Sequence, residues 1–280
     1  MHYREIQPGL SLRPFVECFW TLESAQSSAP SQPERILPDG CVELILNFGA
    51  QFKEHQENGQ SEQQPFHFLV GQMTRPIVIA PTGRVELIGV RFHPGGTLPF
   101  FRIPMHEITN RVVELGALAR NIEREVMARV AEEPSLTLKI AALEKLLVQR
   151  VDSCQHDSRL MTLAAKIVKS GGQVSLDLLA RAGGVSSRHL ERRFLRDVGV
   201  GPKMLCRILR FQQTFRAVDR NDPGWAAVAA DCGYFDQAHL IRDFRQFAQQ
   251  TPTVLLAQSS PLTAAFTRKE RRSDFSNTLD

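Results

Sequence analysis

The sequence has no apolar run that approaches the roughly 18 residues needed to cross a bilayer. Its first residues, Met1 to Glu5, lack the basic and then apolar layout of a secretory signal. The five cysteines never occur two residues apart as Cys-X-X-Cys, which argues against a disulfide scaffold or a structural zinc site; they are Cys18, Cys41, Cys154, Cys206 and Cys232. We therefore expect reduced thiols, a cytoplasmic protein and no membrane partner.

Signatures of catalysis are also missing. A metal-dependent cupin site commonly begins with a His-X-His pair, and this sequence has none, because His67, His93 and His106 are isolated. The spacing suggests no Ser-His-Asp, Cys-His or paired-carboxylate arrangement. We expect no catalytic residue, no metal and no cofactor, and hence no enzyme.

What the sequence does have is an uneven distribution of charge. The 280 residues, 42% of them hydrophobic, are enough for two domains. Residues 1–157 carry 15 Lys and Arg against 19 Asp and Glu, a net charge of −4, whereas residues 158–257 carry 15 against 8, a net charge of +7. A basic domain favours a polyanion, either nucleic acid or an anionic membrane surface.

The front of the chain has the pattern of a β-domain. Short apolar or alternating runs, separated by turn signals such as Pro38-Asp39-Gly40, indicate strands at 15–22, 41–48, 66–70, 76–80 and 85–92. This pattern predicts an antiparallel sandwich or barrel, and the polar stretch Gln51–Pro65 is expected to be a loop. The run His93-Pro94-Gly95-Gly96 before Thr97 could hold an anion at a helix start or form a simple turn.

The period changes after Ile103. Ile122, Val126 and Val130 form one helical stripe, and Ile140, Leu143, Leu147 and Val151 form a second, with Pro134-Ser135 between them. Such a helical pair is either a linker or dimer interface, or it packs on its own domain.

The basic half contains a repeat with an offset of 50 residues. Seven of the 23 positions from 180 to 202 are identical to their partner: Ala180/Ala230, Gly183/Gly233, His189/His239, Leu190/Leu240, Arg192/Arg242, Phe194/Phe244 and Pro202/Pro252. Ala229 is an alternative partner for Ala180.

Each copy of the repeat predicts a helix-turn-helix. Ser186 and Asp236 are the expected caps of the second helices, and Leu190, Phe194, Leu240 and Phe244 are expected to point inward. The opposite face of the first copy then carries Arg188, Arg192 and Arg196, and that of the second carries Arg242, Arg245 and Gln246, with Gln237 and His239 near the helix start. Arg and Gln are the side chains that read guanine and adenine in the major groove.

These residues resemble an AraC/XylS-type transcriptional regulator over residues 158–257. The resemblance rests on the segments 178–194, Val198-Gly199-Val200-Gly201-Pro202, 233–244 and Phe247 with Thr251-Pro252. It implies that two recognition helices enter successive major grooves. It also implies base-reading roles for Arg188, Glu191, Arg192, Gln237, Ala238, His239, Ile241 and Arg242. We assign phosphate contacts to Arg196, Lys203, Arg207 and Arg245.

The front half resembles the N-terminal domain of an uncharacterised AraC-type branch through Leu37–Ile45, Val70–Pro76 and Gly89–Gly96. This resemblance implies a cupin-like domain that senses a ligand or mediates dimerisation. Trp20, Arg91 and Phe92 are candidates for an effector pocket.

The sequence thus predicts an α+β protein of two domains. The expected parts are a β-rich cupin-like domain at 1–110, a helical linker or interface at 111–157, an all-α DNA-binding domain at 158–257 and a disordered tail at 258–280. Double-stranded DNA is the expected partner. A small-molecule effector, a homodimer and, for an activator, RNA polymerase are further expected partners. The alternatives are a cupin-like enzyme with an accessory DNA-binding domain and a nonspecific DNA-packaging protein.

Overall fold

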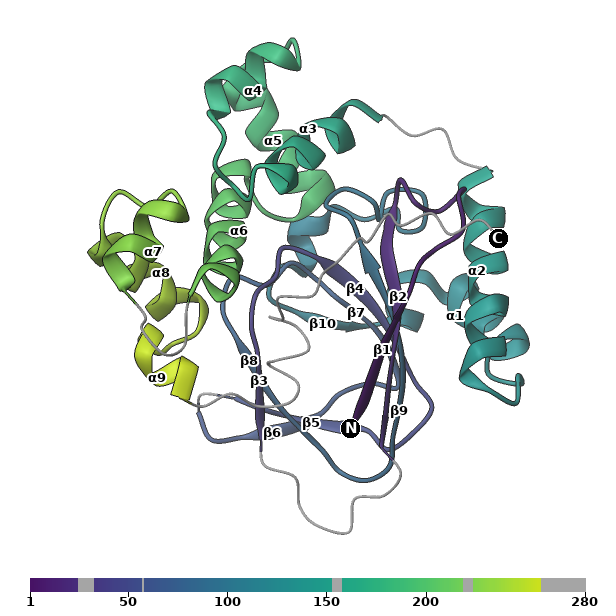
Figure 1. Cartoon of the computed structure of the whole chain (residues 1–280). Coiled ribbons are helices and arrows are strands. Elements are labelled where there is room, and N and C mark those ends of the chain that lie inside the picture. The colour runs from purple at the N-terminus through teal and green to yellow at the C-terminus, as the bar shows by residue number, and fades with distance from the viewer. Residues whose placement is uncertain (25–32, 57, 153–157, 219–223, 258–280) are drawn as a thin grey trace, which may run out of the picture.

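A β-rich front half and an all-α back half confirm the predicted class (Figure 1). The computed structural model describes residues 1–24, 33–56, 58–152, 158–218 and 224–257. Cys154, the boundary at 157 and the tail at 258–280 therefore lie outside the described residues.

Two antiparallel sheets form the front half, and they do not close into a barrel. The larger sheet has six strands in the order β1 (His2–Ile6), β2 (Val16–Ser24), β9 (Val85–Phe92), β4 (Val42–Asn47), β7 (His67–Val70) and β10 (Val112–Glu114). The smaller sheet has four strands in the order β3 (Glu34–Ile36), β8 (Ile77–Pro81), β5 (Phe52–His55) and β6 (Ser61–Gln63). Alternation along β2 gives the larger sheet two buried faces: Trp20 packs toward the smaller sheet, and Phe19 packs in the opposite core.

The five predicted strands are confirmed, with ends that differ by at most two residues. The predicted loop at Gln51–Pro65 is wrong, because β5 and β6 form a hairpin there. Strand β6, at the edge of the smaller sheet, is exposed at every residue, and its neighbour β5 buries only Phe52, so neither strand has an apolar alternation that would reveal it. The run after His93 forms turns through residue 100, which is the second of the two alternatives that the sequence left open, and no helix starts there.

Helices α1 (Leu115–Arg129) and α2 (Leu136–Asp152) pack on their own domain. Both predicted apolar stripes are buried in one core with β-strand residues such as Leu44, Val90 and Phe92. The helix pair therefore covers the face of the larger sheet that the smaller sheet leaves open (Figure 1). Met105–Ile108 form a short 3₁₀ helix, η1, before β10.

Between residues 158 and 257, the described part of the back half contains seven helices: α3 (Ser158–Lys169), α4 (Leu176–Ala182), α5 (Ser187–Val198), α6 (Pro202–Ala217), α7 (Trp225–Asp231), α8 (Gln237–Phe247) and α9 (Pro252–Ala257). They build two separate hydrophobic cores, and α6 contributes to both. Leu205 and Cys206 belong to the core of α3–α5, whereas Ile208 and Phe211 belong to the core of α7–α9. Within the described ranges, no helix is long and apolar enough to span a bilayer.

The two halves are in direct contact. Thr109 Oγ1, just after η1, donates a hydrogen bond of 2.7 Å to the carbonyl of Gly199 at the end of α5. Arg35 Nη1 on β3 donates one of 2.7 Å to the carbonyl of Ala248 after α8. Both helix-turn-helix units therefore rest on the β-domain.

Candidate nucleic-acid interface

The first helix-turn-helix is α4 followed by α5. The turn ends with Gly184 in the left-handed region at φ +64°, which a residue with a Cβ rarely adopts. Ser186 then caps α5, because its hydroxyl accepts a hydrogen bond from the amide of His189, as predicted. Leu190 and Phe194 are buried at 2% and 0% exposure, so the outward face of α5 is fixed by its own apolar stripe.

The second unit is α7 followed by α8, built in the same way. Gly233 takes the left-handed conformation at φ +73°, and the carboxylate of Asp236 accepts a hydrogen bond of 2.6 Å from the amide of His239. Leu240 and Phe244 are buried. The predicted cap and inward residues are confirmed here too.

The structure corrects the alignment of the two turns. The amide of Val185 bonds to the carbonyl of Ala180, and the amide of Tyr234 bonds to that of Ala229. Ala180 and Ala229 are buried, whereas Ala230 is exposed. The first helix and turn thus repeat with an offset of 49 residues and the second helix with one of 50, because the second unit has one more residue between turn and cap. The identities Ala180/Ala230 and Gly183/Gly233 are therefore not structural equivalences.

The predicted base-reading residues of α5 lie on one exposed surface. Arg188, Glu191 and Arg192 are all exposed. Arg192 Nη2 lies 3.3 Å from Nδ1 of His189, one turn earlier on the helix. The Glu191 carboxylate lies against Gly201 at the start of α6 and leaves no room there for a Cβ.

On α8 the predicted residues divide into two groups. Gln237, Ala238 and Arg242 are exposed, and the first two stand in the first turn of the helix. His239 is half-buried, with its ring edge-on to Tyr234 at a centroid distance of 5.1 Å. Ile241 is also half-buried and packs against the α7–α9 core. The exposed group is the part of α8 that has room to meet a base pair.

The four predicted phosphate contacts have different environments. Lys203 and Arg245 are exposed. Arg196 has a side chain that is 56% exposed and pairs with Asp197. Arg207 differs, because its guanidinium donates to Asp243 Oδ1 at 2.6 Å and to Gln246 Oε1 at 2.6 Å. Asp243 is completely buried, so Arg207 neutralises an internal carboxylate.

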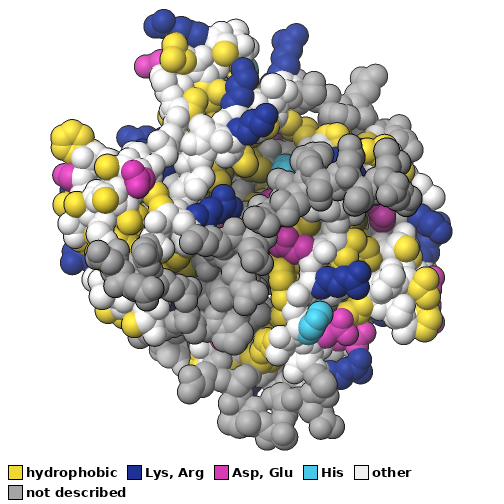
Figure 2. All heavy atoms as spheres, in the orientation of Figure 1, with side chains coloured by type: hydrophobic (Ala, Val, Ile, Leu, Met, Phe, Trp, Pro, Cys, Tyr) yellow, Lys and Arg dark blue, Asp and Glu magenta, His cyan; other side chains and the backbone are white. Residues whose placement is uncertain are grey.

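The sequence reasoning missed an exposed aromatic side chain at the start of α8. Phe235, the residue before the cap Asp236, is 93% exposed. Phenylalanine side chains are usually buried, and an exposed one can mark an interaction site. The position of Phe235 directly before the expected cap Asp236 was the sequence feature that could have drawn attention to it. Figure 2 shows several Lys and Arg side chains on the surface over α3–α5 at the top of the view.

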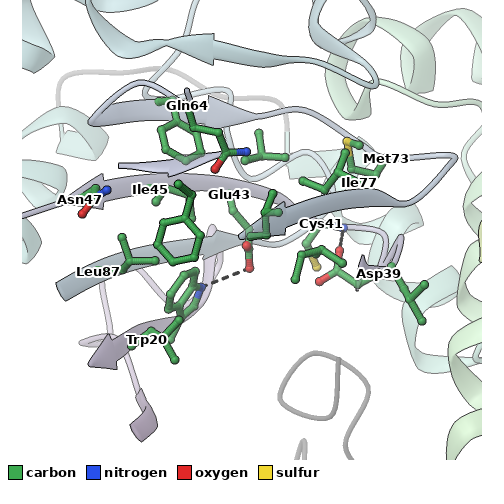
Figure 3. A pocket seen from close by; sticks show the side chains of 17 residues that line it. Trp20, Asp39, Cys41, Glu43, Ile45, Asn47, Gln64, Met73, Ile77 and Leu87 are labelled. Carbon is green, nitrogen blue, oxygen red and sulfur yellow. Dashed lines mark hydrogen bonds between the residues drawn. The ribbon is translucent and has the colours of Figure 1, made fainter. Parts of the chain in front are cut away.

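The predicted effector residues of the β-domain do not share one surface. Trp20 lines a cavity between the two sheets (Figure 3). Arg91 is fully buried and contacts Glu43, which lines the same cavity. Phe92 is wrong as a pocket residue, because it is completely buried in the core under α1 and α2. Neighbouring residues of a strand point to opposite faces, so Arg91 and Phe92 cannot both face this cavity.

No group of three His, Cys, Asp or Glu side chains that could hold a metal ion occurs among the residues that the structure describes. Burial of the imidazole lowers the pKa of His67 and of His93, so the neutral form of both is favoured. Burial raises the pKa of the Cys18 thiol to about 12 and of the Cys206 thiol to about 11, so both thiols stay protonated at neutral pH.

Family profiles match both halves of the chain. Residues 179–258 match a helix-turn-helix domain family of the AraC type, and residues 4–114 match a domain of unknown function, DUF6597. The chain carries an AraC-type helix-turn-helix domain. The AraC-type match supports a DNA-binding transcription regulator. No curated protein matches the chain in sequence.

Solved structures similar to this chain include two of ToxT from Vibrio cholerae and one of the AraC-like activator CuxR. A 1.65 Å ToxT structure has a TM-score of 0.46 and 11% identity, covering 85% of this chain and 98% of that one. ToxT bound to an unsaturated fatty acid has a TM-score of 0.45 and 10% identity, covering 85% and 94%. CuxR has a TM-score of 0.26 and 11% identity, covering 73% and 83%.

Proposed function

We propose that the chain is a sequence-specific transcription regulator whose helices α5 and α8 enter successive major grooves of one DNA duplex. The observation that carries this proposal is a matched pair of capped helices with exposed polar faces, both attached to α6. Arg188 and Arg192 occupy the face of α5, and Gln237 and Arg242 that of α8. Forked Arg and Gln donors suit the edges of guanine and adenine.

In this mechanism the two sets of residues have separate tasks. Arg188, Glu191 and Arg192 read one block of base pairs, and Gln237, Ala238 and Arg242 read the next. Lys203, Arg196 and Arg245 hold the phosphates and add affinity without sequence preference. We assign Arg207 to the fold instead, since its donors face Asp243 and Gln246.

The β-domain is proposed as the regulatory part. The described residues of 1–110, together with α1 and α2, form one packed unit that contacts the DNA-binding domain beginning near residue 158. We propose that this unit senses a ligand and thereby changes the contact. A homodimer or a contact with RNA polymerase would add to this function and is not needed for one chain to present two reading helices.

Selection of bound duplexes from random DNA by the full-length chain, at fixed salt, tests the proposal. We expect enrichment of an asymmetric site with two short blocks about 10 base pairs apart. Tight binding without an enriched sequence would make the chain a nonspecific binder. Absence of binding at moderate salt would refute the DNA-binding function.

A further inference from the structure

The aromatic side chain before α8 is exposed to an unusual degree. Phe235 is 93% exposed, more than any other large apolar side chain in the part of the chain that the structure describes. Figure 2 shows apolar side chains on the surface over α7 and α8, at the left of the view. Because removal of apolar surface from water stabilises a complex, Phe235 offers binding free energy to a partner that covers it.

Phe235 is also the residue by which the second helix-turn-helix exceeds the first. In the first unit, Val185 alone separates Gly184 of the turn from the cap Ser186, and Val185 packs against the core of that unit. In the second unit Tyr234 takes the place of Val185, with the equivalent backbone hydrogen bond and an exposure of only 5%. The inward position is thus filled before the chain reaches Phe235, which has no counterpart in the first unit.

The backbone on both sides of Phe235 is held in place. Before it, Tyr234 is buried, and the Arg210 guanidinium lies 5.4 Å from the centroid of its ring. After it, Asp236 caps α8 through its carboxylate. A hydrophobic residue before a cap often packs on the fourth residue of the helix, here Leu240, but a side chain that is 93% exposed makes no such contact. Phe235 is therefore presented to the outside without a packing role in the fold.

The neighbours of Phe235 are base-reading residues of the proposed mechanism. Gln237 and Ala238 are exposed in the first turn of α8, directly after the cap. Among the groups that base pairs present in the major groove, the 5-methyl group of thymine is the apolar one, and phenylalanine is one of the side chains that contact it. Gln237 suits adenine, the pairing partner of thymine, so a block read by this turn offers a matching group to both side chains.

Building on the proposed role of α8 in the major groove, we propose that Phe235 contacts the 5-methyl group of a thymine in the block of base pairs that α8 reads. Phe235 is then a specificity-determining residue for that base pair. Because the first helix-turn-helix has no equivalent residue, this contact belongs to one block only and contributes to the asymmetry of the site.

Replacement of single thymines by uracil tests the contact, since uracil lacks only the 5-methyl group and keeps the base pair. Binding of the full-length chain is measured by fluorescence anisotropy on the duplex enriched by selection, with each thymine of both blocks replaced in turn. We expect one replacement, in the block whose preference Arg242→Ala removes, to weaken binding about fourfold, equivalent to about 0.8 kcal/mol for one buried CH₂ group. The contact would be refuted if every uracil duplex bound as tightly as the parent duplex.

A double-mutant cycle then assigns the methyl contact to Phe235. In Phe235→Ala the ratio of thymine to uracil affinity at the sensitive position should fall to about one, while the ratios at the other thymines stay as in the wild type. Phe235→Leu should retain part of the preference, because it keeps an apolar side chain. A wild-type ratio in Phe235→Ala, even with weaker binding to both duplexes, would overturn the assignment.

Two controls separate this contact from an effect on folding. Since Phe235 is exposed, the urea midpoint of Phe235→Ala should equal that of the wild type. Phe66→Ala removes another exposed phenylalanine, at 48% exposure in the β-domain, and should keep the wild-type ratio. Loss of the ratio in Phe66→Ala as well would show that the preference does not come from Phe235.

The failure of this contact differs from the failure of the proposed function. A chain that selects two blocks but has no thymine sensitive to uracil would refute the contact and leave the regulator intact. A chain that selects no sequence would refute the regulator, and the contact with it. Wild-type affinity of Phe235→Ala for both duplexes would overturn the contact and assign the exposed ring to a protein partner instead.

Discussion

Mutation of Arg207 and of Arg245 separates a structural role from a phosphate contact, because the sequence predicts a phosphate contact for both and the structure gives them different surroundings. Arg207→Ala removes the cation that donates to the fully buried Asp243. Breaking a buried ion pair on one side costs about 3–5 kcal/mol, since the remaining charge is left uncompensated. The guanidinium also lies 5.3 Å from the centroid of the Phe247 ring, a contact that stabilises by about 0.5–1 kcal/mol at exposed sites and by more where it is desolvated.

Arg245→Ala removes an exposed side chain of the same type from α8. Surface substitutions of this kind change stability by no more than about 0.5 kcal/mol. We therefore expect a urea unfolding curve close to that of the wild type for Arg245→Ala, and one shifted to clearly lower urea for Arg207→Ala. DNA binding by Arg245→Ala should weaken alike on all sequences, with the salt slope reduced by about one.

Circular dichroism in urea and fluorescence anisotropy with labelled duplexes at several salt concentrations measure both effects. The reasoning would be refuted by an Arg207→Ala variant as stable as Arg245→Ala but with a reduced salt slope. That result would return Arg207 to the phosphate contacts.

Other predictions concern Gly40, a helix cap and a thiol. Gly40→Ala should lower the free energy of unfolding by about 1–2 kcal/mol because of the left-handed backbone, and by about 1 kcal/mol more because the new Cβ crowds Leu205 of α6. Gly59→Ala, at φ +81° with no heavy atom within 4 Å, should lose the backbone contribution alone. Equal urea midpoints for the two variants would contradict this. Asp236→Ala should lose about 1 kcal/mol of stability and weaken DNA binding through the start of α8, and unchanged binding would show that the cap does not position Gln237. Burial raises the pKa of Cys18 to about 12, so this thiol should react with iodoacetamide at pH 8 far more slowly in the native chain than in urea. The stability that its buried thiol contributes is full below the ordinary pKa of a thiol and is lost as the pH rises above that value. Fast labelling of the native chain, measured by mass spectrometry, would contradict its burial.

Local patterns were enough to predict the recognition helices. The spacing of Leu190 and Phe194, and of Leu240 and Phe244, fixes which face of each helix is buried, and a capping residue fixes where each helix starts. Strands with an alternating apolar pattern were predictable for the same reason. The hairpin of β5 and β6 was not, because Phe52 is its only buried strand residue.

Contacts between distant segments were beyond the sequence. Nothing near Arg207 in the chain indicates that it faces Asp243, which is 36 residues away. The structural equivalence of Ala180 and Ala229 depends on which glycine takes the left-handed conformation at the end of each turn. An alignment that counts identical residues contains no information about that conformation. The placement of Phe92 was an avoidable error, because alternation along a strand separates it from Arg91.

Two reading helices in one chain are the central claim, and removing one base-reading arginine at a time tests it most directly. Selection from random duplexes is repeated with full-length Arg192→Ala and Arg242→Ala. The account predicts that each variant loses preference within one block only, at a cost of about 1–3 kcal/mol for its base pair, and that the two blocks differ. Loss of both blocks in either variant, or unchanged preference in both, would contradict it.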